Sequence, residues 1–343
     1  MKSIDSLKQI AQNIIVSGKG ILAADESSPT IAKRFAAHDI PNTEENRLLY
    51  RSSLFATDGL SQYISGTILF DETIRQSVDR TPMPKLISDA GLIPGIKVDG
   101  GLRDLPGFPG EKFTQGLDEL LPRLEEYREL GAGFSKWRAV VAIGDNLPTH
   151  TAVETAAHTL AMFAALSQEA GLVPIVEPEI LMNGDHTIER CQEVSEDALL
   201  AVFAELAAHR VCLEGMLLKT GMILSGQDCD VQADTDTIAA CTLECMRRTV
   251  PAAVPGILFL SGGQSEIEAT ERLNAICQTK DVPWALSISF GRALQATALK
   301  TWGGNPNNIP AAQSALLHRA KCNSLAMLGE YPSETERGGL PDS

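Results

Sequence analysis

The 343-residue chain contains eight short apolar runs rich in β-branched residues, with a longer helical pattern after each of them. The runs cover residues 21–24, 63–70, 93–98, 134–143, 173–180, 215–220, 257–260 and 284–290. Stretches such as 151–170 and 197–209 place apolar side chains three or four positions apart, as helices that cover a sheet do. Strands joined by helical crossovers run parallel, so the sequence predicts an α/β protein with a parallel sheet.

Eight strands favour one architecture, a single (β/α)₈ TIM barrel, because eight is the strand number of the commonest closed barrel of this kind. The alternative is a doubly wound open sheet. Such barrels often exceed about 250 residues, so the length fits one domain. We expect the barrel to occupy residues 1–331. The polar, Gly/Pro-rich residues 332–343 are expected to form a mobile tail.

The composition excludes several classes of partner. A net charge of −15 argues against nucleic acid, which requires a basic face. No stretch approaches the roughly 20 uninterrupted apolar residues of a membrane helix. The N-terminus lacks the apolar run of a secretory signal, which predicts a cytoplasmic location. The seven cysteines have no paired spacing and are expected to be reduced.

Polar residues gather where the predicted strands end. In a (β/α)₈ barrel these carboxyl ends form the mouth that holds the active site. Residues two apart on a strand share a face, so Lys136 with Arg138 and Glu177 with Glu179 should point the same way. The full set comprises Asp25, Glu26, Ser27, Lys97, Lys136, Arg138, Glu177, Glu179, Lys219, Ser261, Gly262, Gly263, Gly291 and Arg292. Burying charges beside a barrel core costs free energy unless they form ion pairs or serve a function. This set therefore favours an active site at the mouth.

This inventory suits imine chemistry. A desolvated lysine beside other cations loses its proton more readily, which frees an amine to attack a carbonyl. Neighbouring carboxylates can move the protons for loss of water and carbon–carbon cleavage. Phosphate sites in these barrels commonly lie in the loops after the last two strands, where Ser261, Gly262, Gly263 and Arg292 fall. The residues alone do not decide which lysine is the nucleophile.

Metal and nucleotide chemistry lack support in the sequence. The six histidines are His38, His150, His158, His186, His209 and His318. None of them ends a predicted strand, so we expect surface or interface positions and no zinc cluster at the mouth. No dinucleotide-binding G-x-G-x-x-G follows a strand, and no P-loop motif occurs. The sequence therefore predicts an enzyme without a metal or a cofactor.

Seven segments at the strand ends closely resemble class I fructose-bisphosphate aldolase, and the resemblance runs over residues 19–331. The segments are GKGILAADES (18–27), GIKVD (95–99), FSKWR (134–138), VPIVEPEI (173–180), LEGMLLK (213–219), FLSGGQSE (259–266) and FGRALQ (290–295). The resemblance implies a metal-independent enzyme that forms a Schiff base.

The resemblance also implies roles for individual residues. Lys219 matches the lysine that attacks the ketone, and Glu177 matches the acid/base that removes water from the carbinolamine. Asp25 matches the residue that helps to remove the C4 hydroxyl proton. Lys136, the fourth catalytic residue, matches a cation that orients the intermediate together with Arg138, a binding residue. The other binding residues are those for the two phosphates: Arg292, Ser261, Gly262 and Gly263 for the C1 phosphate, and Lys97, Arg34 and Ser27 for the C6 phosphate.

Three positions depart from the family pattern. Ser28-Pro29-Thr30 replaces a small flexible triplet, and Pro29 suits the first turn of a helix. Thr220-Gly221 follows the lysine, where the family carries Pro-Asn. The chain ends without the family's terminal tyrosine, and its final tyrosine is Tyr331.

The predicted function is reversible cleavage of fructose 1,6-bisphosphate to dihydroxyacetone phosphate and glyceraldehyde 3-phosphate. A second interpretation is another Schiff-base phosphosugar aldolase or a transaldolase, although two cationic ends favour a bisphosphate. A third is a catalytically silent scaffold, which would not need Asp25, Glu177 and Lys219 together. The expected partner is a phosphorylated sugar, and the resemblance implies a homotetramer.

Overall fold

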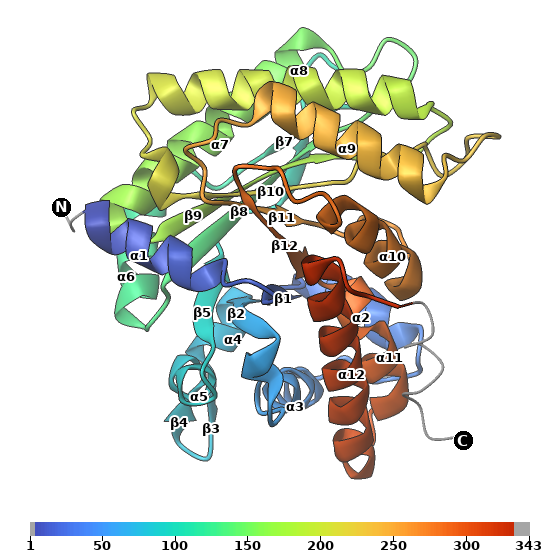
Figure 1. Ribbon diagram of the computed structural model, residues 1–343. Helices are drawn as coiled ribbons and strands as arrows, with labels where there is room; N and C mark the ends of the chain where they lie inside the picture. The colour runs from blue at the N-terminus through green and yellow to red at the C-terminus, as the bar shows by residue number, and fades with distance from the viewer. Residues whose placement is uncertain (1–3, 333–343) are drawn as a thin grey trace.

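Eight parallel strands close into a barrel in the computed structural model, which describes residues 4–332 (Figure 1). The predicted TIM barrel is confirmed, and the open doubly wound sheet is wrong. Around the ring the order is β1-β12-β11-β10-β9-β8-β5-β2, so the first and last strands are neighbours. The strands are β1 (Gly20–Ala24), β2 (Ile64–Leu69), β5 (Ile93–Lys97), β8 (Phe134–Val141), β9 (Val173–Ile180), β10 (Leu217–Thr220), β11 (Gly256–Phe259) and β12 (Ala285–Phe290).

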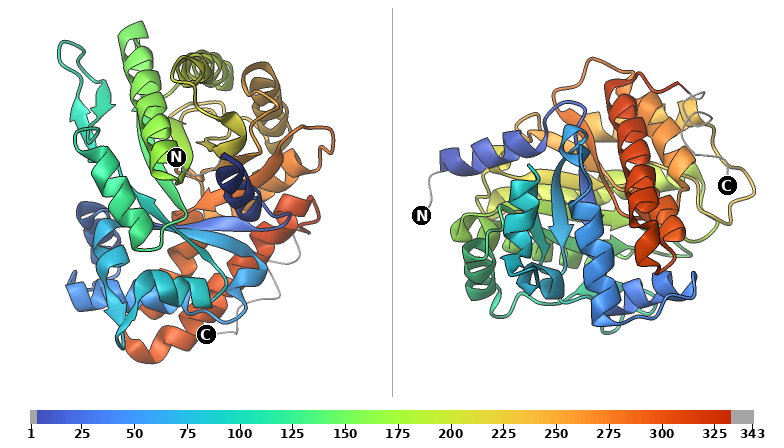
Figure 2. Two further views of the ribbon diagram at one scale, coloured as in Figure 1. Left: turned by 90° about the vertical axis from the view of Figure 1, so that its left-hand side faces the viewer. Right: turned by 90° about the horizontal axis from the view of Figure 1, so that it is seen from below.

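Helices surround this ring, as both views of Figure 2 show. They are α1 (Ile4–Ile14), α2 (Ser28–Ala36), α3 (Glu44–Phe55), α4 (Asp71–Arg75), α5 (Met83–Asp89), α6 (Leu120–Glu129), α7 (His150–Ala170), α8 (Ile188–Ala208), α9 (Thr235–Thr249), α10 (Glu266–Cys277), α11 (Arg292–Trp302) and α12 (Ile309–Leu328). Their apolar faces and the outward faces of the strands form one large buried layer. Among the described residues, no helix is long and apolar enough to cross a membrane.

A second, smaller apolar cluster fills the barrel itself and its N-terminal end. Leu7, Ala11 and Ile14 of α1 pack there with inward side chains of the strands, including Phe134. The Phe134 ring needs Gly95 beside it, because a Cβ at that position would lie only 2.2 Å from the ring. Side-chain packing of this kind makes the lower barrel a core and leaves only the carboxyl ends of the strands for a site.

The shorter elements lie outside the barrel. Two small antiparallel hairpins leave it, β3 (Ser77–Val78) with β4 (Thr81–Pro82) and β6 (Leu102–Asp104) with β7 (Lys112–Thr114). Three 3₁₀ turns complete the described chain: η1 (Leu60–Gln62), η2 (Leu213–Gly215) and η3 (Pro306–Asn308). The apolar pattern did not predict these elements, because strands of two or three residues are too short to show an alternation.

Candidate active site

The mouth of the barrel contains a cavity of about 990 Å³, lined by residues from the carboxyl ends of the strands. Of the predicted site residues, Gly263 alone does not line it. Those that do are Asp25, Ser27, Arg34, Lys97, Lys136, Arg138, Glu177, Lys219, Ser261, Gly262 and Arg292. Strand alternation therefore placed Lys136 with Arg138 and Glu177 with Glu179 correctly, since all four line the cavity.

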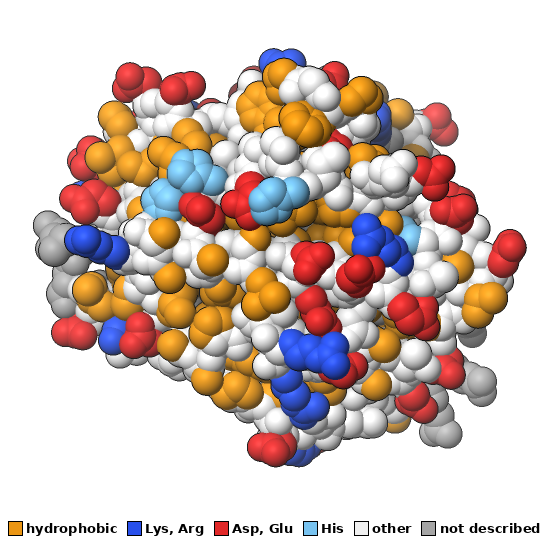
Figure 3. Space-filling model, turned by 90° about the horizontal axis from the view of Figure 1, so that it is seen from above, with side chains coloured by type: hydrophobic (Ala, Val, Ile, Leu, Met, Phe, Trp, Pro, Cys, Tyr) orange, Lys and Arg blue, Asp and Glu red, His pale blue; other side chains and the backbone are white. Residues whose placement is uncertain are grey.

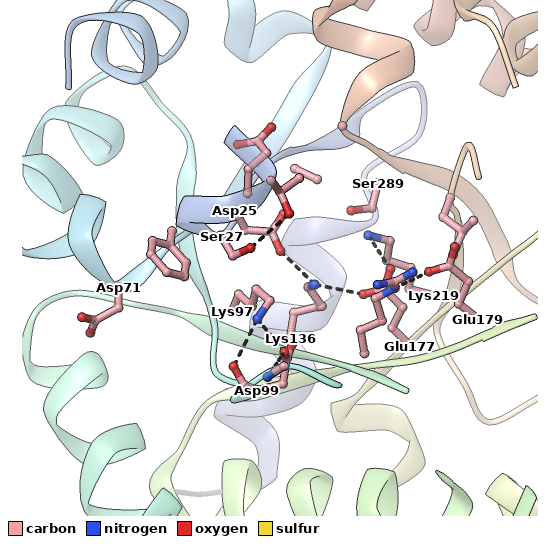
Figure 4. Close-up of a pocket in the computed structure, with 18 of the residues that line it drawn as sticks. Asp25, Ser27, Asp71, Lys97, Asp99, Lys136, Glu177, Glu179, Lys219 and Ser289 are labelled. Carbon is pink, nitrogen blue, oxygen red and sulfur yellow. Dashed lines mark hydrogen bonds and ion pairs between the residues drawn. The ribbon is translucent and has the colours of Figure 1, made fainter. Parts of the chain in front are cut away.

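A buried chain of ion pairs crosses the cavity floor (Figure 4). Lys136 Nζ lies 2.8 Å from Asp25 Oδ2 and 3.1 Å from Glu177 Oε2. The other Glu177 oxygen, Oε1, lies 2.9 Å from Lys219 Nζ. Side chains of Lys136, Glu177 and Lys219 are each at most 6% exposed. Glu177 thus holds two lysines at once, one on each carboxylate oxygen.

Charge pairing outweighs burial in this chain. Burial alone would raise the pKa of Asp25, but the ammonium groups of Lys136 and Lys219 reverse that effect and lower it. Burial would likewise raise the pKa of Glu177, and the same two lysines lower it. For Lys136, burial would lower the pKa, but the carboxylates of Asp25 and Glu177 raise it. All three groups are therefore ionised at neutral pH.

The loop after β11 and the start of α11 meet at one side of the mouth. Arg292, the first residue of α11, donates a hydrogen bond from Nη2 to the carbonyl oxygen of Gly262. Gly263 does not line the cavity, and its backbone N–H donates to Met182 Sδ, with the nitrogen 2.7 Å from the sulfur. The cavity thus presents Ser261, Gly262 and Arg292 together, while Gly263 is engaged by a side chain from the loop after β9.

Lys97 and Arg34, predicted to serve one phosphate end, have different surroundings. Lys97 Nζ lies 2.5 Å from Asp99 Oδ1. Arg34 pairs with the buried Glu26, and its Nη2 would lie 3.5 Å from a Cβ added at Gly291, at the end of β12. Arg34 therefore faces the β12 side of the mouth, at Gly291, which directly precedes Arg292. Its predicted contact with the C6 phosphate stays a prediction.

Several lining residues were not among the predicted site residues. Ser289 is buried near the end of β12, and Asp99 neutralises Lys97. Glu26 is buried beneath Arg34 and Arg51. Ser289 could have been found from the sequence, because it is a polar residue close to the carboxyl end of an apolar strand. Glu26 lies at the end of the first predicted strand, but its pairing with Arg34 and Arg51 has no local sequence signal, since these partners lie on α2 and α3.

The histidines lie away from the mouth, as predicted. Within the described chain, the cavity lining includes neither histidine nor cysteine, so imidazole and thiolate ligands for zinc are missing there. One histidine departs from its predicted surface position: His186 is buried, and burial lowers its pKa. The described cysteines are unbridged, in agreement with the reduced state expected from the sequence.

Two of the departures from the family pattern are accommodated locally. Pro29 lies in the first turn of α2, as its fixed φ predicted. Ser27 precedes that helix, and its Oγ lies 3.0 Å from Thr30 Oγ1. Thr220 is the buried last residue of β10, directly after Lys219. The altered loops thus begin at helix and strand ends, without displacing Lys219 or Asp25 from the cavity.

Comparison with known proteins identifies relatives over the full length of this fold. A family model described as fructose-bisphosphate aldolase class-I matches residues 6–341. A probable fructose-bisphosphate aldolase class 1 of Xanthomonas campestris pv. campestris is 52% identical over 331 residues, covering 96% of this chain and 99% of that protein. The fructose-bisphosphate aldolase of Dictyostelium discoideum is 49% identical, with 100% and 97% covered.

A solved structure agrees with these relatives. It is the fructose-bisphosphate aldolase of Plasmodium falciparum, in a ternary complex with TRAP and a small-molecule inhibitor. Its TM-score is 0.95 at 47% sequence identity, and 96% of each chain is covered. The closed barrel, the buried lysine–carboxylate chain at its mouth and these similarities agree: the chain belongs to the class I fructose-bisphosphate aldolases.

Proposed function

We propose that this chain cleaves fructose 1,6-bisphosphate reversibly into dihydroxyacetone phosphate and glyceraldehyde 3-phosphate, with Lys219 as the lysine that forms the Schiff base. The observation that carries this assignment is the 2.9 Å distance between Lys219 Nζ and Glu177 Oε1. A nucleophilic lysine needs a base within hydrogen-bond reach. Lys97 is paired with Asp99 and does not contact Glu177, the acid/base of this proposal, and the pKa of Lys136 is raised between two carboxylates, which keeps it protonated.

The first half of the reaction uses Glu177 twice. Its carboxylate takes a proton from the Lys219 ammonium, and the neutral amine attacks C2 of the ketose to form a carbinolamine. Glu177 then returns that proton to the C2 hydroxyl, which leaves as water and yields the iminium ion. Against the effect of burial, Lys136 and Lys219 lower the pKa of Glu177, so it is ionised in the free enzyme and its carboxylate is available to accept this proton.

The second half breaks the C3–C4 bond. Asp25, ionised and paired with Lys136, accepts the C4 hydroxyl proton as C4 becomes the aldehyde carbon. The bonding electrons move to C3, and the iminium nitrogen takes them up as an enamine. Glyceraldehyde 3-phosphate leaves, C3 is protonated, and water hydrolyses the iminium to dihydroxyacetone phosphate and free Lys219. Lys136 offsets negative charge at Asp25 and Glu177 without donating a proton.

Cations on opposite sides of the mouth suit a substrate with two phosphates. Ser261, Gly262 and Arg292 are assigned to the C1 phosphate, since a guanidinium and backbone N–H groups at a helix start bind phosphate well. Lys97 is assigned to the C6 phosphate. A monophosphate enzyme such as a transaldolase would need only one of these ends, so the bisphosphate is the better-supported substrate. We further propose a cytoplasmic homotetramer.

The assignment of Lys219 is tested by trapping the imine. Borohydride added with dihydroxyacetone phosphate should reduce the iminium to a stable secondary amine, located by peptide mass spectrometry. We expect the adduct on Lys219, and an adduct on Lys97 or Lys136 would contradict the proposal. Cleavage of the bisphosphate should continue in EDTA. An EDTA-sensitive activity restored by zinc would assign the enzyme to a metal-dependent mechanism.

A further inference from the structure

Two helices on the outer face of the barrel bring two imidazoles to one carboxylate. His158 lies on α7, whereas Glu205 lies on α8 and His209 directly follows that helix. His158 Nδ1 is 2.9 Å from Glu205 Oε2, and His209 Nδ1 is 3.5 Å from the same oxygen. Figure 3 shows histidine side chains gathered beside acidic ones on the face that includes α8.

These atoms have the spacing of a small metal site. The one ligand atom that each residue offers lies within 4.8 Å of the other two. Zinc–nitrogen bonds of about 2.0–2.1 Å and zinc–oxygen bonds of about 2.0–2.2 Å place neighbouring ligands of a tetrahedral site roughly 3.4 Å apart. His158 Nδ1 lies 2.9 Å from Glu205 Oε2, close to that value, and exposed side chains change rotamer readily enough to bring an imidazole nitrogen of His209 to the same ion.

The local hydrogen bonding also suits a metal ligand. His209 Nδ1 lies 2.9 Å from the backbone carbonyl oxygen of Glu205. A carbonyl only accepts, so this bond places the proton on Nδ1 and leaves Nε2 with the lone pair that a metal requires. If both imidazoles were protonated, two cations would lie close together, because the ring centroids are 5.1 Å apart. Repulsion between like charges disfavours that state and favours neutral rings, which can bind a metal.

We propose that His158, Glu205 and His209 bind one divalent cation of the zinc type, with water in the remaining position. Two imidazoles and a carboxylate form a ligand set that zinc accepts. None of the three residues lines the catalytic cavity, so this ion takes no part in aldol cleavage. It links α7 to α8, and an ion that binds only the folded chain stabilises it.

The test is a zinc titration of the whole enzyme, stripped of metal, by isothermal calorimetry and by thermal unfolding. Wild type should bind one Zn²⁺ per chain with a Kd at or below the micromolar range, and its melting temperature should rise with zinc. His158→Ala and Glu205→Gln should each weaken binding at least tenfold. His150→Ala is the matched control, because it removes an exposed imidazole from the same helix.

Two results would overturn the proposal. One is zinc binding of unchanged stoichiometry and affinity in His158→Ala, which would assign the ion to thiols or other groups. The other is wild type that binds no zinc at these concentrations. Bisphosphate cleavage in EDTA is recorded on the same samples and should be equal in all of them. That readout depends only on the catalytic assignment, so failure of one proposal is distinguishable from failure of the other.

Discussion

Lys136 is a buried cation whose charge is compensated by two ion pairs, with the carboxylates of Asp25 and Glu177. Lys136→Met removes the charge and keeps most of the stem. Breaking a buried ion pair by deleting one partner costs about 3–5 kcal/mol, because the remaining charge is left uncompensated. We expect a loss of this size at pH 7, measured as the free energy of unfolding in urea. The exposed Lys85→Met is the control and should change little.

The same variant makes a prediction about pH. Asp25 and Glu177 have lowered pKa values in the folded chain, so their ionisation stabilises the fold above the unfolded values of 3.8 and 4.5. That stabilisation is lost as the pH falls through the folded values. The Lys136→Met variant lacks a cation that lowers these pKa values, so it does not have this part of the stabilisation at any pH. Its stability deficit should therefore shrink as the pH falls below the unfolded values of 4.5 and 3.8, and a deficit that grows on acidification would contradict the assigned charges.

Arg292 is the residue on which the C1-phosphate assignment depends. Arg292→Ala removes charge-assisted hydrogen bonds worth roughly 1.5–3 kcal/mol, or about 10- to 150-fold in kcat/KM. Because the assignment is to the C1 phosphate, fructose 1-phosphate should suffer about as much as the bisphosphate. A penalty confined to the bisphosphate would move Arg292 to the C6 end. Arg103→Ala is the matched control, because Arg103 is an exposed arginine of β6 that does not line the cavity.

Among the secondary-structure elements, α10 begins shortly after residues 261–263, which we assign to the C1 phosphate, and a capping box closes its first turn. Ser265 Oγ accepts from the N–H of Glu268, and the Glu268 carboxylate accepts from the N–H of Ser265. Ser265→Ala should lower the free energy of unfolding by about 0.5–2 kcal/mol, since one helix N–H loses its acceptor. Ser88→Ala, at an exposed helical site on α5, should show no such loss.

The elements also show what the sequence can predict. All eight barrel strands lie where the apolar runs predicted them, because each run is long enough to show its pattern. α8 begins at Ile188, well before the helical stretch at 197–209, because Thr187 caps it with a side-chain oxygen. The contact between Met182 and Gly263 joins residues 81 positions apart through a weak sulfur acceptor. No local pattern carries such information.

Site prediction from the sequence was limited in a similar way. Strand-end position found Asp25, Glu177 and three lysines, because parallel strands bring their carboxyl ends together. Choosing Lys219 among the lysines required the family resemblance. The distances give an independent reason: Lys219 Nζ pairs with Glu177 alone, whereas Lys136 Nζ pairs with both Asp25 and Glu177. Pairing of this kind depends on χ angles that sequence spacing does not specify.

For the molecule as a whole, the C-terminus bears on enamine protonation. Tyr331 is buried, its N–H donates to Asn274 Oδ1 on α10, and it does not line the cavity. The predicted tail lies almost entirely outside the described residues. We expect C3 of the enamine to be protonated by Glu177 or water. Removing residues 332–343 should then slow solvent deuterium exchange into dihydroxyacetone phosphate by less than about threefold, under roughly 1 kcal/mol in barrier.

Intact enzyme assayed in parallel is the reference for this truncation. A slowing of about tenfold or more would show that the removed residues take part in proton exchange. The melting temperature of the truncated enzyme separates such an effect from a loss of folding, because Tyr331 and its bond to Asn274 are retained.

The helix α1 and the Phe134 ring close the lower end of the barrel. In the described part of the chain, the site opens through the cavity at the carboxyl ends of the strands, so under the proposed mechanism the substrate, water and both products pass through this mouth. After cleavage the three-carbon ketone half stays bonded covalently to Lys219 in that mechanism, so the aldehyde departs first and, in the synthetic direction, arrives last. The covalent bond sets this order, and the closed lower end means that the departing aldehyde and the water that later hydrolyses the iminium use the same opening in turn.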